Sequence, residues 1–391
     1  IKDYDRFLNK NFTLELNHFT DETFLRLQQS KSIEDFFKQD YTGLNTRFKK
    51  LYKNFSFDER KRVINNYCQY IEISQQILEY LVNTNKLEEL LKFTGYTNII
   101  VTTNEKIKNM DKMVAILKTD ALLKENDKTL YIKESYHENI LYEVKDIIFA
   151  KKTLDDWANK INSARVDGKE LSPLEKFCFA YMIVKNRKYK ESEERSLRQI
   201  SRNIIPILNS DYCVCVGFCE LLNELCSRIG IQCTDKLIRV GIFHAINVIL
   251  LNDEKYGIKN SLYYSDPTFD CTTNGNTFFS CLVKDLEDVF ASYDDTNLYK
   301  NLDNNELQLF NGDNVLLKKS IDNTQKISGT NIIKALTAVF ESQGKTTHDV
   351  ANYLEPTFEG VRNNIETYKH TWAYQVLKEH GIIQTSDSKQ L

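Results

Sequence analysis

The sequence has no apolar run that approaches the roughly 20 residues needed to cross a bilayer; one of its longest is "HAINVILLN". Its N-terminus, "IKDYDRFLNK", is charged where a signal peptide would be apolar. We therefore expect a soluble protein without a membrane partner. Because the sequence begins at Ile1 rather than at methionine, a removed leader or secretion without a classical signal stays open.

The chain also lacks an excess of charge of either sign. Its 52 basic and 55 acidic residues give a net charge of -3 and are interspersed along the chain. No overall field attracts a polyanion, and we expect no nucleic-acid partner. Internal repeats and low-complexity segments are absent as well. With 391 residues, of which 41% are hydrophobic, the chain can bury a large core and is long enough for two or three domains.

A spaced disulfide framework is missing too. The chain has nine cysteines, an odd number, and they are crowded where a small secreted scaffold would space them. This pattern predicts reduced thiols and a cytoplasmic location.

Periodicity divides the chain into four parts. Apolar residues recur at helical spacing from residue 19 to about residue 91, which predicts a helical region over residues 1–95. Residues 96–165 contain the β-rich runs "TNIIVTT" and "KTLYIKES" with the helix-like stretch 108–126 between them, which predicts a small mixed α/β segment. After a polar boundary, residues 166–300 carry the candidate chemistry, and residues 301–391 predict a C-terminal helical extension. We expect the α+β class.

The segment 211–234, "DYCVCVGFCELLNELCSRIGIQCT", holds five of the nine cysteines. From residue 216 onward apolar residues recur at helical spacing, and Gly230 stands where the helix is expected to end. Three interpretations of the crowded thiols are open: a metal site, a disulfide cluster, or one reactive thiol among structural ones. The five are Cys213, Cys215, Cys219, Cys226 and Cys233.

The spacing disfavours a metal site. "C-V-C" leaves one residue between thiols where common zinc knuckles have at least two, and no second Cys/His pair follows at knuckle spacing. We therefore expect no bound metal. Free cysteine behaves as a small buried hydrophobe, so Cys68, Cys178, Cys219 and Cys226 are interpreted as core residues.

Cys215 differs because it is expected in the first turn of the helix. Unpaired backbone N–H groups and the helix dipole favour an anion there, which lowers the pKa of a thiol. Gly217, two residues on, permits the close approach of backbone or substrate. Alone, this position is still more typical of a structural cysteine.

A nucleophilic thiol needs an imidazole as base and usually a third group that orients it. Of the six histidines only His244 lies in a β-rich run, "LIRVGIFHAINVILLN". A hairpin loop and a second strand, "SLYYSDPTFD", follow and lead to Asp266. Adjacent antiparallel strands predict that Asp266 lies beside His244. Taken singly, each residue has a simpler interpretation: His244 as a buried structural histidine, and Asp266 as part of a Pro turn that closes the strand.

Together, "CVGFCELLNELCSRIGIQC", "HAINVIL" and "YYSDPTFD" resemble the transglutaminase-like superfamily of papain-type cysteine enzymes, whose core has C-x-G-[FY], H-A-W-N and D-x-T-[WF]-D. The similarity covers about residues 171–270, and the helices before it resemble those of transglutaminase-domain proteins from Firmicutes. It implies a papain-like core in residues 166–300, with Cys215 as nucleophile, His244 as base and acid, and Asp266 as orienting carboxylate. Ile246 stands where the family has Trp.

The resemblance implies a cysteine-nucleophile enzyme that acts on a protein or peptide amide through a thioester and needs no cofactor. The Cys215 backbone N–H would bind the oxyanion, with Tyr212 or Asn209 as candidates for a second donor. Gly217, Phe243 and Asn247 would lie near the substrate. The alternative is a catalytically silent transglutaminase fold that serves as a binding module.

Overall fold

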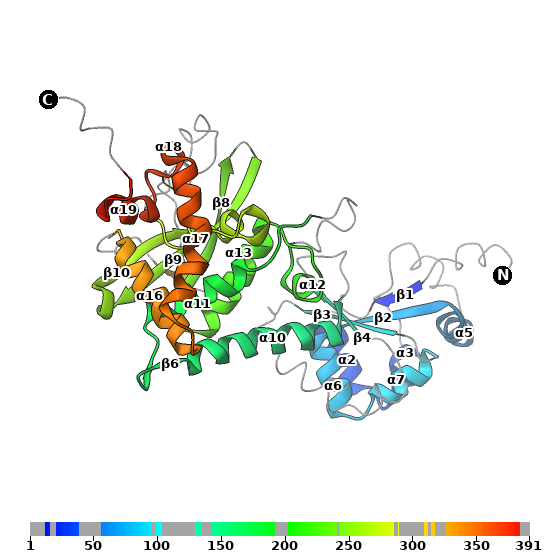
Figure 1. Cartoon of the computed structure of the whole chain (residues 1–391). Helices are drawn as coiled ribbons and strands as arrows, with labels where there is room; N and C mark the ends of the chain where they lie inside the picture. The colour runs from blue at the N-terminus through cyan, green and yellow to red at the C-terminus, as the bar shows by residue number, and fades with distance from the viewer. Residues whose placement is uncertain are drawn as a thin grey trace. The chain divides into compact units, whose positions relative to one another are not determined.

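The computed structural model describes residues 12–15, 21–38, 56–95, 98–103, 130–134, 142–191, 202–240, 242–284, 288, 309–311, 314–316 and 326–383 (Figure 1). The chain divides into two compact units, residues 1–151 and 152–391. The division falls inside the 20-residue helix α10 (Val144–Ser163). Each unit has its own sheet, and the two are described separately.

Unit 1 is organised around a five-stranded sheet in the order β1-β2-β3-β4-β5. Its strands are β1 (Phe12–Glu15), β2 (Cys68–Ser74), β3 (Asn98–Thr103), β4 (Leu130–Glu134) and β5 (Tyr142–Glu143). Strands β1 to β4 are parallel and β5 is antiparallel to β4. Parallel neighbours need a crossover connection, and helices supply one between β2 and β3.

The helices of unit 1 are α2 (Asp21–Gln29), α3 (Ile33–Lys38), α5 (Phe57–Tyr67), α6 (Gln75–Asn83) and α7 (Leu87–Phe93). The crossover from β2 starts at Ser74, whose hydroxyl accepts the Ile77 N–H and caps α6. Helices α2, α3, α6 and α7 lie below the strands in Figure 1. The buried core between these layers includes Leu78 and Leu90.

The prediction of a helical region over residues 1–95 missed the strands β1 and β2. The run "CQYIEIS" places Ile71 and Ile73 on one face, and both are fully buried. β2 is also the middle of three parallel strands, hydrogen-bonded to β1 and β3. Helical spacing continues through these residues in the sequence, but sheet pairing with distant strands decides the local structure.

Unit 2 contains a three-stranded antiparallel sheet in the order β10-β9-β8. Its strands are β8 (Gln232–Val240), β9 (Ile242–Asp253) and β10 (Ile258–Ser265). The single β-rich run predicted around His244 is thus two strands, since the β8–β9 ladder ends at the Val240–Ile242 pair. The predicted hairpin between β9 and β10 is confirmed, and its turn contains Gly257 with φ of 68°.

Helices α11 (Pro173–Lys185) and α13 (Cys215–Arg228) pack on this sheet, and Figure 1 shows both close to β8 and β9. The neighbouring helices are α12 (Ile204–Asn209) and α14 (Pro267–Asp270), with the short 3-10 helices η3 (Glu254–Tyr256) and η4 (Thr272–Asn274). Two small hairpins complete the described part of unit 2: β6 (Arg165–Val166) with β7 (Lys169–Glu170), and β11 (Leu309–Asn311) with β12 (Asn314–Leu316).

The C-terminal residues form α16 (Gly329–Ser342), α17 (Thr347–Asn363), α18 (Ile365–Tyr368) and α19 (Trp372–Glu379). These helices are part of the core of unit 2, because α16 packs on α11. The Phe278 N–H donates to Thr357 Oγ1 at 2.8 Å, and Trp372 Nε1 donates to the Phe278 carbonyl at 2.9 Å. The C-terminal helices therefore fix the segment that follows α14.

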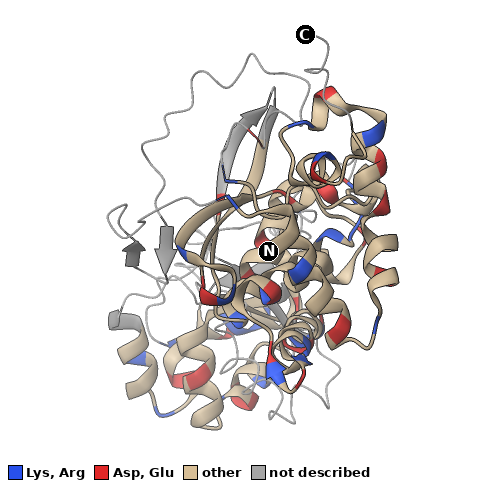
Figure 2. Ribbon diagram, turned by 60° about the vertical axis from the view of Figure 1, so that its left-hand side comes forward, with Lys and Arg blue, Asp and Glu red and all other residues tan. Residues whose placement is uncertain are grey.

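The structure contains both helices and small sheets, which is compatible with the predicted α+β class. The four-part division of the chain remains a prediction. The helix predicted over 108–126 lies outside the described residues. None of the helices described is long and apolar enough to pass through a membrane. Figure 2 shows basic and acidic positions interspersed along the described helices.

Candidate active site

Cys215 is the first residue of α13. Val214 before it is extended, with φ of -116° and ψ of 179°, and its carbonyl accepts the Phe218 N–H at 3.0 Å. The entry to the helix is held by a two-bond bridge between Lys190 and Cys213, each N–H donating to the other's carbonyl at 2.9 Å. The predicted helix start is confirmed, and so is its end, where Gly230 has φ of 78°.

The antiparallel pairing of β9 with β10 brings His244 and Asp266 together. Ser265 pairs with Asn247, so the next residue, Asp266, leaves the end of β10 close to His244. His244 Nε2 lies 2.8 Å from Asp266 Oδ2. Asp266 is completely buried, His244 is 8% exposed, and the second carboxylate oxygen accepts the Phe269 N–H at 3.1 Å. The carboxylate is therefore held by α14 on one side and by the imidazole on the other.

The electrostatics of Cys215 and His244 favour a charged pair. Burial raises the pKa of the Cys215 thiol, but hydrogen bonds from the His244 side chain and from the Ala245 and Val216 backbone, with the His244 charge, lower that pKa below its usual value. Burial lowers the pKa of His244, while the charge and hydrogen bond of Asp266 and the contact with Cys215 raise it to about 10. Both shifts favour a thiolate beside an imidazolium over the neutral pair.

The other thiols near the segment behave differently. Burial raises the pKa of Cys213 to about 12, and it raises the pKa of Cys219 and Cys233 well above the ordinary value. Cys226 is fully buried. Within the described residues no group of three or more His, Cys, Asp or Glu side chains could hold a metal ion. Position within the fold, and not the number of cysteines, distinguishes Cys215.

The predicted oxyanion donors differ in their availability. The Cys215 N–H belongs to the first turn of α13, where backbone donors have no partner within the helix. The Asn209 amide donates to the Ile205 carbonyl at 2.8 Å inside α12. The Tyr212 N–H donates to Ser210 Oγ at 3.2 Å, and its ring lies 4.8 Å from the Lys190 ammonium. These contacts already engage the Asn209 amide and the Tyr212 N–H, and the identity of the second donor stays a prediction.

Of the residues predicted near the substrate, Gly217 is buried in the first turn of α13. Phe243 pairs with Arg239 in the β8–β9 ladder, and its side chain lies outside the described part. Asn247 is fully buried, and its amide donates to the Cys219 carbonyl at 3.1 Å and to Asn223 Oδ1 at 2.9 Å. The Asn247 side chain therefore ties β9 to α13, and its place near the substrate stays a prediction.

Tyr189 lies near the thiol although nothing in its sequence context singles it out. It precedes the Lys190–Cys213 bridge, its N–H donates to Thr273 Oγ1 at 2.9 Å, and its side chain is 36% exposed. Burial raises the pKa of Tyr189, and the charge of Cys215 raises it further. A long-range bridge between two loops brings this residue to the site, and such a bridge has no local sequence signal.

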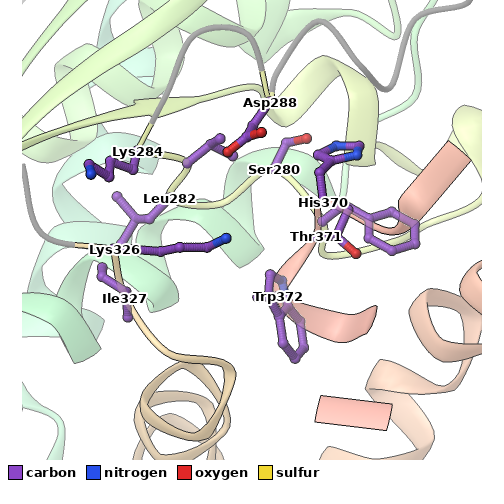
Figure 3. Close-up of a pocket in the computed structure, with 11 residues that line it drawn as sticks. Ser280, Leu282, Lys284, Asp288, Lys326, Ile327, His370, Thr371 and Trp372 are labelled. Atoms are coloured by element: carbon purple, nitrogen blue, oxygen red, sulfur yellow. The ribbon is translucent and has the colours of Figure 1, made fainter. Parts of the chain in front are cut away.

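Two cavities lie elsewhere in unit 2. One of about 30 Å³ is lined by Ser280, His370 and Trp372 among others (Figure 3), which is room for about one or two water molecules. Another, of about 420 Å³, is lined by residues that include Glu175, Lys255 and Glu341. Neither is lined by Cys215, His244 or Asp266.

Comparisons with known proteins give no family for the chain. No protein-family model and no curated protein matches it. The geometry around Cys215 and the sequence resemblance are what bear on function.

Proposed function

We propose that the protein is a cysteine-nucleophile enzyme that acts on a protein or peptide amide through a thioester. The observation that carries the proposal is a thiol with a lowered pKa at the start of a helix, hydrogen-bonded to an imidazole that a buried carboxylate contacts at 2.8 Å. A nucleophile, a base and an orienting group in contact form the arrangement that covalent catalysis requires. The resemblance to the transglutaminase-like superfamily supports the same assignment, and with it a papain-like core.

In the first step the Cys215 thiolate adds to the amide carbonyl carbon, and the carbonyl oxygen becomes an oxyanion within reach of the Cys215 N–H. The C–N bond then breaks as the His244 imidazolium gives its proton to the departing nitrogen. Ammonia or an amine leaves, and the acyl group remains on the sulfur as a thioester. Asp266 keeps His244 oriented and stabilises its charged form before the proton is transferred.

In the second step a nucleophile attacks the thioester carbonyl while His244, now neutral, accepts its proton. Water gives a carboxylic acid, so the net reaction is deamidation or peptide hydrolysis. A primary amine gives a new amide, so the net reaction is transamidation. Either way the sulfur leaves as the thiolate and the imidazolium is restored.

The rival proposal is a silent transglutaminase fold that binds a partner. A buried His–Asp pair alone would suit either role, but the lowered pKa of Cys215 favours the enzyme. Cys213 and Cys219, in the same segment, have raised pKa values, chiefly because they are buried.

The test compares alkylation of individual cysteines by iodoacetamide at pH 7, followed by peptide mass mapping, in the wild type and in Cys215→Ala. Cys215 should be labelled at least about tenfold faster than Cys213 or Cys219, because the thiolate is the reactive form. Ammonia release from glutaminyl peptides, with and without an amine acceptor, then separates deamidation from transamidation. Labelling of Cys215 no faster than that of Cys219, or stoichiometric zinc in the purified protein, would overturn the nucleophile assignment.

A further inference from the structure

Asp270, four residues after Asp266, is the centre of a buried hydrogen-bond network that the proposed reaction does not use. Its carboxylate is completely buried. One oxygen accepts the Tyr181 hydroxyl at 2.5 Å and the Ser280 N–H at 2.7 Å, and the other accepts the Thr277 hydroxyl at 2.6 Å and the Phe279 N–H at 2.9 Å. Both backbone N–H groups can only donate, so the network suits an ionised carboxylate with all four acceptor positions filled.

A buried cation accompanies this carboxylate. Lys185, on α11, is 1% exposed, and its ammonium donates to Asn276 Oδ1 at 2.7 Å and lies 5.0 Å from the centre of the Tyr353 ring. Burial raises the pKa of Asp270, while its hydrogen bonds and the charge of Lys185 act in the opposite direction. An unpaired charge in the core would be strongly destabilising. The four donors and the cation compensate for the burial of the Asp270 carboxylate.

The same network holds the backbone of Asp266 from both sides. The single hydrogen of the Tyr181 hydroxyl is shared between two acceptors, Asp270 Oδ2 at 2.5 Å and the Asp266 carbonyl at 3.0 Å. On the other side the Asp266 N–H donates to the Ser280 carbonyl at 2.9 Å, and the Ser280 N–H is one of the donors to Asp270. Tyr181 and Ser280 therefore each contact both the Asp270 carboxylate and the Asp266 backbone.

The position of the Asp266 backbone decides where its carboxylate meets His244. The side chain is short, and one of its oxygens is already fixed by the Phe269 N–H, so it has little freedom to compensate for a shift of its own backbone. Because Nε2 of His244 contacts the Asp266 carboxylate, the other ring nitrogen is the one available to the Cys215 thiol. A displacement of about 1 Å in such a chain of contacts has large effects on reactivity.

We propose that Asp270 and Tyr181 are positioning residues of the Cys215–His244–Asp266 triad, which act by fixing the backbone of Asp266. The inference rests on the proposed function, because it names what supports the same site. It also connects that site to the C-terminal helices, since Phe278, beside Phe279 in this loop, is held by Thr357 and Trp372. Figure 3 shows Ser280 and Trp372 facing the same small cavity.

The test is the pH dependence of Cys215 alkylation in the full chain, measured for the wild type and Tyr181→Phe. The substitution removes only the hydroxyl, and the alkylation midpoint should move upward by about one pH unit, with a rate at pH 6 that is about tenfold lower. Tyr353→Phe is the matched control, because the Tyr353 hydroxyl is buried and has no hydrogen-bond partner among the described residues. It should leave the midpoint unchanged. Asp270→Asn should move the midpoint in the same direction as Tyr181→Phe.

Circular dichroism and thermal unfolding of each variant separate positioning from loss of fold. If Asp270→Asn does not fold, Tyr181→Phe decides alone. A wild-type midpoint for Tyr181→Phe, together with a raised midpoint for Asp266→Asn, overturns the positioning role and leaves the proposed function intact. A wild-type Cys215 that is no more reactive than Cys219 refutes the proposed function instead, whatever the variants do.

Discussion

Asp266→Asn tests the electrostatics of the site most directly. The side chain keeps its size and an oxygen that can accept the Phe269 N–H, but it loses the negative charge 2.8 Å from His244 Nε2. The charge and the hydrogen bond of Asp266 are the first two causes that raise the pKa of His244 to about 10 from its ordinary 6.5. A neighbouring opposite charge is worth about one to three pKa units, so the pKa of His244 should fall by that amount.

The thiol responds in the opposite sense, because the His244 charge and hydrogen bond are among the causes that lower the pKa of Cys215. Its pKa should therefore rise, and each unit reduces the thiolate fraction about tenfold below the midpoint. The rate of Cys215 alkylation at pH 6 should fall by about tenfold or more. At high pH the thiol is ionised in both proteins, so the rates of variant and wild type should converge.

Iodoacetamide labelling quenched at set times, followed by peptide mass mapping, gives the rate of Cys215 alkylation between pH 5 and 10 for the variant and for the wild type. An unchanged midpoint would refute the reasoning. So would an equal loss of rate at every pH, because that outcome indicates a changed accessibility of the sulfur and not a changed pKa.

The remaining predictions use tryptophan fluorescence, because both tryptophans, Trp157 and Trp372, lie in unit 2. The raised pKa of His244 means that its charged form stabilises the folded state fully below pH about 6.5 and that this contribution is lost as the pH rises toward about 10. The difference in urea midpoint between wild type and His244→Asn should therefore shrink between pH 6 and 10, and a constant difference would contradict this. Thr357→Val leaves the buried Phe278 N–H without its acceptor and should cost about 1 to 3 kcal/mol, against a small effect for Thr337→Val, whose hydroxyl donates only within α16. Equal midpoints for the two Thr variants would show that Thr357 does not support unit 2.

Local sequence signals were sufficient for the parts of the site that depend on one element each. Apolar spacing and Gly230 located α13. Alternation located the strand of His244, and the hairpin placed Asp266 at the end of its neighbour. Each of these features follows from residues within about one turn or one hairpin of each other.

Features that depend on distant partners were not predictable in this way. Strand β2 lies in a segment of helical spacing and is a strand because β1 and β3 pair with it. The hydrogen bonds from the Asn247 amide to the Cys219 carbonyl and to Asn223 on α13 were likewise not predicted. The two-bond bridge that brings Tyr189 to the thiol joins Lys190 to Cys213, which no hairpin or helical pattern in the sequence connects.

The sequence alone determined the order of the candidate groups: a cysteine that begins a helix, a histidine on a strand and an aspartate after the next strand. Tertiary structure decided the ionisation of these groups, because the pKa of a thiol depends on how deeply it is buried and on which charges and N–H groups surround it. The spacing of apolar residues along the sequence contains no information on the depth of burial of a thiol or on the charges around it. The contacts that hold Asp266 come from Tyr181, 85 residues earlier, and from Ser280, so only the folded chain brings them together.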